Sequence, residues 1–154
     1  MGNKIIDEFH GAKYGFLSNF HKCSIVYHGI RYNHSEGAFQ AQKTLDEQKR
    51  REISMLDPGR AKRTCGRHGS ITLRPDWEEV KDNLMYEIVL AKFTQNNDLK
   101  EKLLETGDAE LIEGNTWHDN YWGNCTCNKC KSIEGQNNLG KILMRVREEL
   151  GECK

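Results

Sequence analysis

The sequence has no excess of charge of either sign, no long apolar run and no internal repeat. Lys plus Arg and Asp plus Glu number 23 each, and this balance argues against a protein that holds nucleic acid by non-specific charge. No apolar run approaches the roughly 18 residues that a membrane span needs. Without linkers or low-complexity segments, the 154 residues indicate one domain, residues 1–154, with a hydrophobic core.

Targeting signals and a disulfide framework are missing as well. The start MGNKIIDEFH has no signal-peptide apolar segment, and Ile6 stands where a myristoylation motif needs Ser or Thr. Six cysteines are too few for a disulfide scaffold, and the cytosol would keep them reduced. We therefore expect a cytoplasmic monomer with no membrane partner.

Local patterns predict a hairpin and several helices. Residues 23–32 indicate two strands around His28-Gly29, a dipeptide suited to a tight turn. Asp46 and Asp57 are expected to cap the helices that follow them. The predicted helices cover residues 35–43 and 47–55, begin at Pro58, run from Pro75 to about Gln95, run from Asn97 or Asp98 to before Gly107, and extend over the stretch with Leu139, Leu143, Val146 and Leu150, ending at Gly151.

The segment SEGAFQAQK, residues 35–43, places Glu36, Gln40 and Lys43 on one stripe of its predicted helix. Spacings of four and seven return close to one direction at about 100° per residue. The stripe is either a solvated face, on which Glu supports Lys electrostatically, or a catalytic face with an acid, a polar positioner and an amine nucleophile.

Two further segments suggest ligands. Between Pro58 and Pro75 the chain carries Arg and Lys but no acid, which fits either an exposed basic face or a phosphate site around Arg67. Residues 114–138 form a long segment with two tryptophans and three cysteines, and such loops are usually functional or stapled by a metal.

The three cysteines of that loop, Cys125, Cys127 and Cys130, are closely spaced, but a structural zinc site needs four ligands. The fourth would be His118 or Cys153, and neither has a standard spacing. The spacing favours three reduced thiols over zinc, so we predict no metal.

Seven motifs follow one another along the chain: FLSNF (16–20), EGAFQAQK (36–43), LRPDW (73–77), AKFTQN (91–96), LLETGDAELIE (103–113), DNYWG (119–123) and GQNNLGKILMRVREEL (135–150). Together they resemble the NADAR superfamily, which includes the YbiA-like proteins, over about residues 9–150. The sequence departs from the common family pattern in two places. Gly37-Ala38 stands where many members have His-Tyr, and a Cys-x-Cys-x-x-Cys run is inserted after the Trp-Gly.

The resemblance implies a mostly helical α+β domain with a small β-hairpin or sheet, and an N-glycosidase that needs no cofactor. The implied substrates carry a bond from ribose carbon 1 to nitrogen. They include ADP-ribosylated guanine in DNA or RNA and the phosphoribosylamino intermediates of riboflavin synthesis. Two alternatives stay open: a non-catalytic module that binds ADP-ribose or NAD, and a zinc-knuckle-like nucleic-acid binder.

The resemblance also implies site residues. Glu36, Lys43 and Asp119 match catalytic positions, and Lys43 is implied to attack ribose carbon 1, with Lys92 as the rival nucleophile. Attack needs a neutral Lys43, which a nearby ionised Glu36 would oppose. The predicted substrate-binding residues are Phe16, Ser18, Asn19, Phe20, Gln40, Arg67, Trp77, Trp117, Tyr121, Trp122, Gly123 and Asn137.

Overall fold

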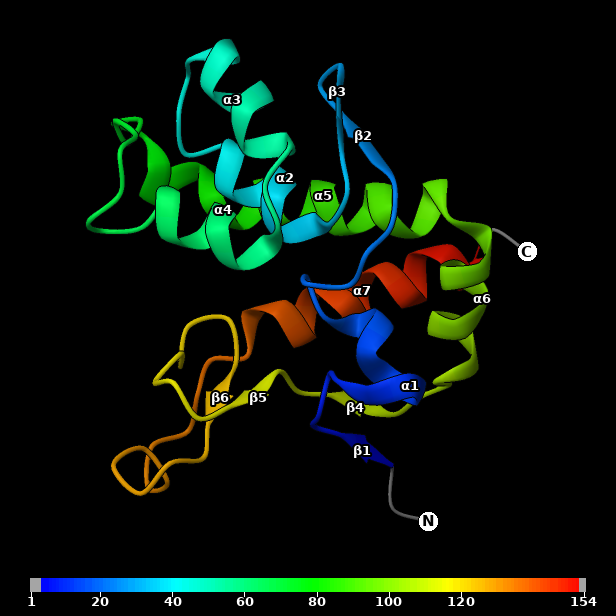
Figure 1. Ribbon diagram of the computed structural model, residues 1–154. Coiled ribbons are helices and arrows are strands. Elements are labelled where there is room, and N and C mark those ends of the chain that lie inside the picture. Colours follow the sequence, from blue (N-terminus) through cyan, green and yellow to red (C-terminus); the bar gives the residue numbers. More distant parts are fainter. Residues whose placement is uncertain (1–3, 153–154) are drawn as a thin grey trace. The chain divides into compact units, whose positions relative to one another are not determined.

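The structure is a computed structural model that describes residues 4–152 (Figure 1). Its elements are β1 (Ile5–Ile6), α1 (Gly11–Tyr14), the 3-10 helix η1 (Gly15–Leu17), β2 (Ile25–Tyr27), β3 (Ile30–Tyr32), α2 (Ser35–Ala41), α3 (Glu47–Ser54), α4 (Pro58–Thr64), α5 (Trp77–Gln95), α6 (Asn97–Glu105), β4 (Glu110–Leu111), β5 (Gly114–Asn115), β6 (Asn124–Cys125) and α7 (Asn138–Glu152). The prediction of a mostly helical α+β fold is confirmed.

Contacts divide the chain into two compact units. One unit is Asn19–Asn97, and the other combines the residues up to Ser18 with those from Asp98 onward. Within residues 4–152, no helix is both long and apolar enough to cross a bilayer.

The unit Asn19–Asn97 is built around α2, which contacts the hairpin and the helices α3, α4 and α5. All seven residues of α2 are buried. The predicted hairpin is confirmed, because β2 and β3 pair antiparallel with Ile25 opposite Tyr32. His28 and Gly29 both have positive φ, which a tight hairpin turn requires.

Two helix caps in this unit follow the prediction and one helix start does not. The Asp46 carboxylate accepts N–H groups of the first turn of α3, and Asp57 does the same for α4, with Pro58 in its first turn. α5 begins at Trp77, two residues after Pro75. Its N-cap Asp76 makes no side-chain cap, since its carboxylate pairs with Arg74 instead.

In the other unit, β1 and β4 pair in parallel and α7 packs against β4. The predicted core leucines of α7 are buried, but the helix runs through Gly151 to Glu152, so the predicted stop was wrong. Gly140 has a packing role, because a Cβ there would collide with the Leu111 carbonyl oxygen. The missing side chain lets α7 approach β4 closely.

Candidate active site

In the unit that contains α7, Asn115 organises the turn that carries Trp117 and Asp119. Its Oδ1 accepts N–H groups from Trp117 at 3.3 Å and from Asp119 at 3.1 Å, and its Nδ2 donates to the Asp119 carbonyl at 2.8 Å. Asn115 is only 5% exposed, so these bonds are shielded from water. Asn115 was not predicted as a site residue, although it lies two positions after the motif that ends at Glu113.

Asp119 in turn orders the segment that follows it. Its Oδ1 accepts the backbone N–H groups of Tyr121 at 3.1 Å and Trp122 at 2.9 Å, and the two aromatic rings meet edge to face with centroids 4.8 Å apart. At Gly123 a Cβ would collide with the carbonyl and carboxylate oxygens of Glu113, so only glycine fits. Trp117 is 57% exposed, which suits a ligand-stacking role as well as a solvated one.

Asn137 was predicted to contact substrate, and the structure gives its side chain structural partners. Its Oδ1 accepts the Glu113 N–H at 2.9 Å, and its Nδ2 donates to the Leu111 carbonyl at 2.9 Å. The residue is buried and has a φ of 52°. These bonds tie the start of α7 to β4, and the substrate contact stays a prediction.

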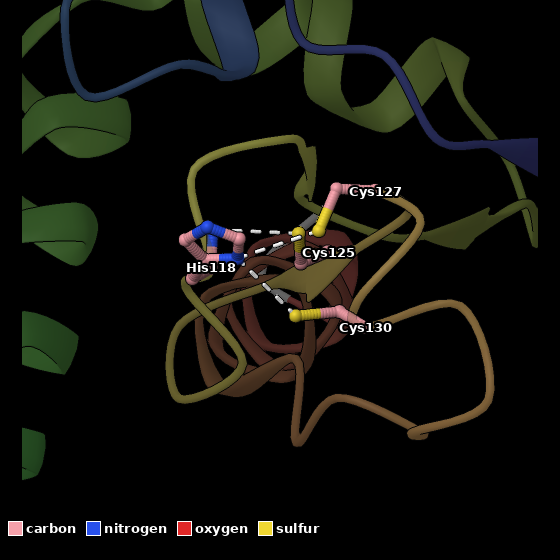
Figure 2. A group of neighbouring side chains, drawn as sticks. All are labelled: His118, Cys125, Cys127 and Cys130. Carbon is pink, nitrogen blue, oxygen red and sulfur yellow. Dashed lines mark hydrogen bonds between the residues drawn. The ribbon is translucent and has the colours of Figure 1, made fainter.

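The same loop brings four candidate metal ligands together. His118, Cys125, Cys127 and Cys130 form one cluster, in which the Nδ1 atom of His118 lies near two of the sulfurs (Figure 2). Cys153, the other candidate fourth ligand, lies outside the described residues. The sequence favoured three thiols without a metal, whereas this arrangement favours a metal site.

In the unit Asn19–Asn97, the N-terminus of α2 is fixed from two sides. His34 Nδ1 accepts the Gly37 N–H at 2.8 Å, and its Nε2 lies 2.9 Å from the Leu56 carbonyl, so the proton sits on Nε2. The backbone carbonyl of Asn19 accepts the Glu36 N–H, and the side-chain Oδ1 of Asn19 accepts the Ser35 hydroxyl. A Cβ at Gly37 would lie 2.7 Å from the His34 ring, so glycine at this unusual family position makes room for the cap.

Glu36 and Gln40 form the buried part of the predicted stripe. They are 8% and 5% exposed, and Gln40 Nε2 donates to Glu36 Oε1 at 3.0 Å. Burial raises the pKa of the Glu36 carboxyl, although Gln40 and nearby positive charges oppose the shift. Among the described residues, buried Gln40 Oε1 has no hydrogen-bond partner, which leaves an acceptor for a donor group of a ligand.

Lys43 does not lie on the helix, contrary to the prediction. α2 ends at Ala41, and Lys43 follows the C-cap Gln42 in a turn. Its Nζ donates to the Cys65 carbonyl at 3.4 Å and lies 5.8 Å from the centre of the Trp77 ring. Burial lowers the pKa of Lys43, with the Cys65 thiol and Glu36 acting in the opposite direction.

These shifts bear on the opposition between Glu36 and Lys43. A raised pKa moves Glu36 toward its neutral acid, and a lowered pKa moves Lys43 toward its neutral amine. Burial therefore opposes an ion pair of the two groups, because a partly desolvated charge is costly. A neutral pair supplies both a proton donor and a usable amine nucleophile.

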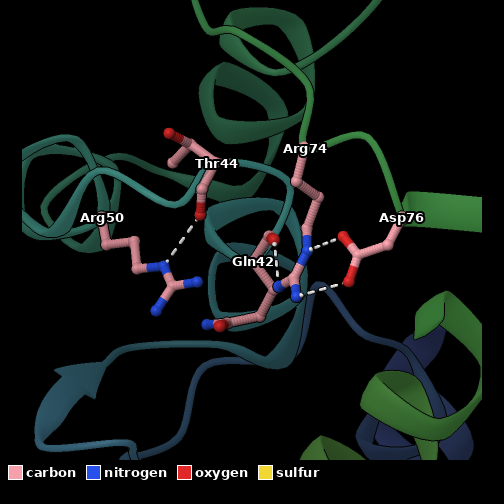
Figure 3. Close-up of polar contacts among 5 residues, drawn as sticks. All are labelled: Gln42, Thr44, Arg50, Arg74 and Asp76. Atoms are coloured by element: carbon pink, nitrogen blue, oxygen red, sulfur yellow. Dashed lines mark hydrogen bonds and ion pairs between the residues drawn. The ribbon is translucent and has the colours of Figure 1, made fainter.

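The turn that carries Lys43 is held by two arginines (Figure 3). Arg74 donates to the Gln42 carbonyl from its guanidinium and to the Lys43 carbonyl from its backbone N–H, and Arg50 Nε donates to the Thr44 carbonyl at 3.0 Å. Asp76 fixes Arg74 in turn, with oxygens 2.6 and 3.1 Å from its Nε and Nη2. Three consecutive carbonyls are thereby satisfied.

Arg74 was grouped with the basic residues proposed for phosphate, but its guanidinium is engaged in this turn. Neither Arg50 nor Arg74 was predicted to position Lys43.

Arg67, the predicted phosphate ligand, is exposed on the loop after α4, and Phe20 is also exposed. Trp77 is buried against Phe39, with ring centres 5.1 Å apart, so it combines core packing with one wall beside the Lys43 amine.

The predicted residues thus fall into two sets. Asn19, Phe20, Glu36, Gln40, Lys43, Arg67 and Trp77 belong to the unit Asn19–Asn97, whereas Phe16, Ser18, Trp117, Asp119, Tyr121, Trp122, Gly123 and Asn137 belong to the other. Within the first set, Gln40 is hydrogen-bonded to Glu36, and the Lys43 amine lies over the Trp77 ring. Phe16 is buried in η1.

Comparison with known proteins identifies the family of this chain. The NADAR domain family matches residues 8–151, almost the whole chain. The chain belongs to the NADAR family.

Named relatives agree with this membership. The NADAR chain is 41% identical over 137 residues to the N-glycosidase YbiA of Escherichia coli, covering 89% of the chain and 82% of the relative. An N-glycosidase of Nostoc punctiforme is 38% identical over 140 residues, with 89% and 86% covered. A riboflavin biosynthesis protein of Vibrio vulnificus is 37% identical over 90% of the chain but only 36% of its own length.

A solved structure supports the fold directly. The NMR structure of Escherichia coli YbiA superposes with a TM-score of 0.80 at 39% identity, covering 99% of this chain and 88% of the other. The NADAR chain therefore shares the fold of that protein.

The rival lysine of the NADAR chain, Lys92, lies on α5 and is 1% exposed. Burial lowers its pKa from 10.5 to about 8, and Cys23 opposes the shift. Between these two pH values the unfolded chain binds more protons than the folded one, so the free energy of unfolding should rise with pH. Below about pH 8 both states carry the proton, and the full cost of the buried charge is present.

Replacing Lys92 with methionine is therefore expected to remove this part of the pH dependence. Relative to the variant, the wild type should gain about 3 kcal/mol in unfolding free energy between about pH 8 and pH 10.5. The measurement is denaturant unfolding at a series of pH values. Lys102→Met on α6 changes an exposed lysine and should leave the wild-type slope intact. Parallel curves for wild type and Lys92→Met would show that Lys92 has no lowered pKa.

Proposed function

We propose that the chain is an N-glycosidase that cleaves the bond between ribose carbon 1 and nitrogen in ADP-ribosyl or related phosphoribosyl N-glycosides. The observation that carries the proposal is the buried Glu36, whose pKa is raised, beside Lys43, whose pKa is lowered, in the family motif EGAFQAQK. Family membership and two relatives named as N-glycosidases support the reaction class.

The proposed chemistry uses the two groups as a neutral pair. Neutral Lys43 attacks carbon 1 with its nitrogen lone pair, and the bond from carbon 1 to the base nitrogen breaks with its electron pair leaving on that nitrogen. Glu36 gives its proton to the departing nitrogen. Glu36, now a carboxylate, takes a proton from the lysine nitrogen and passes it to the ring oxygen, whose bond to carbon 1 breaks as the nitrogen lone pair forms the Schiff base. Water then adds to carbon 1, which releases the sugar and restores the amine. Asp119 stabilises the positive charge that develops at carbon 1.

Substrate recognition is assigned to the remaining predicted residues. Trp117 and Trp122 offer faces on which a base can stack, and Arg67 offers a guanidinium suited to phosphate. The name of the Vibrio vulnificus relative favours phosphoribosylamino compounds of riboflavin synthesis as one substrate class. ADP-ribosylated guanine in DNA or RNA is the other class. We further propose that both units act as one NADAR domain, as a cytoplasmic monomer.

The test is release of free base or amine from a panel of N-glycosides, with ADP-ribosylated guanine and a phosphoribosylaminopyrimidine as its main members. Wild type should hydrolyse at least one, and Glu36→Gln, which keeps the hydrogen-bonding shape but has no acid proton, should be slower by about a hundred-fold or more. Calorimetric titration with ADP-ribose runs in parallel. Binding of ADP-ribose without hydrolysis of any N-glycoside would support a non-catalytic ADP-ribose or NAD module instead.

A further inference from the structure

The cluster in the inserted loop has the composition and spacing of a metal site. The ligand atoms of His118, Cys125, Cys127 and Cys130 all lie within 4.8 Å of one another (Figure 2). The Nδ1 atom of His118 is 3.3 Å from the Cys127 sulfur and 3.4 Å from the Cys130 sulfur. Around a tetrahedral zinc ion, bonds of about 2.3 Å to sulfur and about 2.0 Å to nitrogen place ligand atoms roughly 3.5–3.8 Å apart.

We propose that His118, Cys125, Cys127 and Cys130 bind one structural zinc ion. The donor set decides the metal, because thiolate and imidazole ligands suit zinc, whereas magnesium and calcium prefer oxygen. Four protein ligands fill a tetrahedral shell and leave no open position for water. The site is therefore structural and takes no part in bond cleavage.

The backbone around the ligands is already arranged for a metal. Cys125 lies on β6 and is 1% exposed, and Cys130 is 7% exposed. The turn between Cys127 and Cys130 is closed by a bond from the Cys130 N–H to the Cys127 carbonyl at 3.0 Å. The His118 N–H lies 3.3 Å from the Cys125 sulfur, the kind of N–H donor that stabilises a thiolate ligand.

Residues outside the ligand set hold these positions. Asn115 fixes the turn on both sides of His118 through the N–H groups of Trp117 and Asp119. Asn120 Oδ1 accepts the Cys125 N–H at 2.8 Å. His118 itself has a φ of 69°, an uncommon conformation for a residue with a side chain, and its Nδ1 atom lies near the Cys127 and Cys130 sulfurs.

The position of the proposed ion in the loop indicates a structural role. His118 stands between Trp117 and Asp119, both of which were predicted to serve the substrate. An ion bound to His118 and to the three cysteines would join the Trp117–Asp119 turn to the segment 125–130. The inserted cysteines would thereby stiffen a loop whose regular structure is limited to the two-residue strands β5 and β6.

The test is metal content, which does not depend on the activity proposed above. Protein purified under reducing conditions with zinc and passed through a desalting column should carry about one zinc per chain, as measured by inductively coupled plasma mass spectrometry. Cys127→Ser and His118→Gln should each lower the content at least about ten-fold, since loss of one ligand opens the shell. Cys23→Ser and Cys153→Ser, which change cysteines outside the set, should keep the wild-type content.

A spectroscopic measurement guards against misfolded variants. Wild type loaded with cobalt should show the intense visible absorption of a tetrahedral ion and a thiolate-to-cobalt charge-transfer band, both displaced by zinc. Removal of the metal by a chelator should lower the melting temperature of wild type and leave that of Cys127→Ser unchanged. Wild type without zinc after reconstitution, with iron in its place, or with equal zinc in wild type and Cys127→Ser, would overturn the proposal.

Discussion

Replacing Lys43 with arginine is expected to abolish the covalent adduct that borohydride traps between the enzyme and the sugar of its substrate. Reduction converts a Schiff base into a stable amine, so trapping reports attack by a lysine on carbon 1. Arginine has a similarly long side chain to place near the Trp77 ring, but it holds its proton at any workable pH and cannot attack. Turnover should fall at least about a hundred-fold.

Lys92→Met is the matched comparison for this experiment, because it removes the other lysine considered as nucleophile. It should keep the wild-type yield of trapped adduct, which mass spectrometry of peptides would place at Lys43. An adduct that persists in Lys43→Arg and disappears in Lys92→Met would move the nucleophile to α5. Turnover without a trapped adduct in any protein would favour direct attack by water.

Asp119→Asn is expected to lower turnover by roughly a hundred-fold or more while changing the affinity for ADP-ribose only a few-fold. Asparagine keeps an Oδ1 that can accept the N–H groups of Tyr121 and Trp122, so the turn should be preserved. Only the negative charge is lost. A charge that stabilises the cationic transition state matters more to the rate than to binding of a product.

The two quantities are measured as base release from ADP-ribosylated guanine and as calorimetric binding of ADP-ribose. Asp108→Asn makes the same change at an exposed acid of the same unit and should leave both near their wild-type values. A parallel loss of binding and turnover in Asp119→Asn would make Asp119 a ribose-holding residue.

Local signals in the sequence were sufficient for much of the fold. The hairpin at His28-Gly29 and the caps at Asp46 and Asp57 depend on residues within a few positions of each other, and the structure has all three. The end of α2 was not predictable in this way. Nothing in SEGAFQAQK stops a helix after Ala41, and the turn at Lys43 is held by Arg50 and Arg74, the second of which lies 31 positions further on.

The chemistry of the candidate site was likewise only partly predictable from the sequence. The spacing of Glu36, Gln40 and Lys43 indicated a common face, but spacing cannot show burial, and burial is what moves the pKa values of Glu36 and Lys43 toward a neutral pair. His118 was only one of two candidate partners for the cysteines. The short distances from its Nδ1 atom to the Cys127 and Cys130 sulfurs favour it, and no sequence spacing encodes them.

The order of the units along the chain has a consequence for synthesis on the ribosome. The unit with Lys43 is one continuous stretch, whereas β1 must wait for β4, about a hundred residues later, before it can pair. At about 5–20 residues per second, that delay lasts roughly five to twenty seconds. The nascent chain can therefore complete the unit that contains Lys43 while β1 is still unpaired, and α7, which follows β4 in the sequence, joins the other unit later.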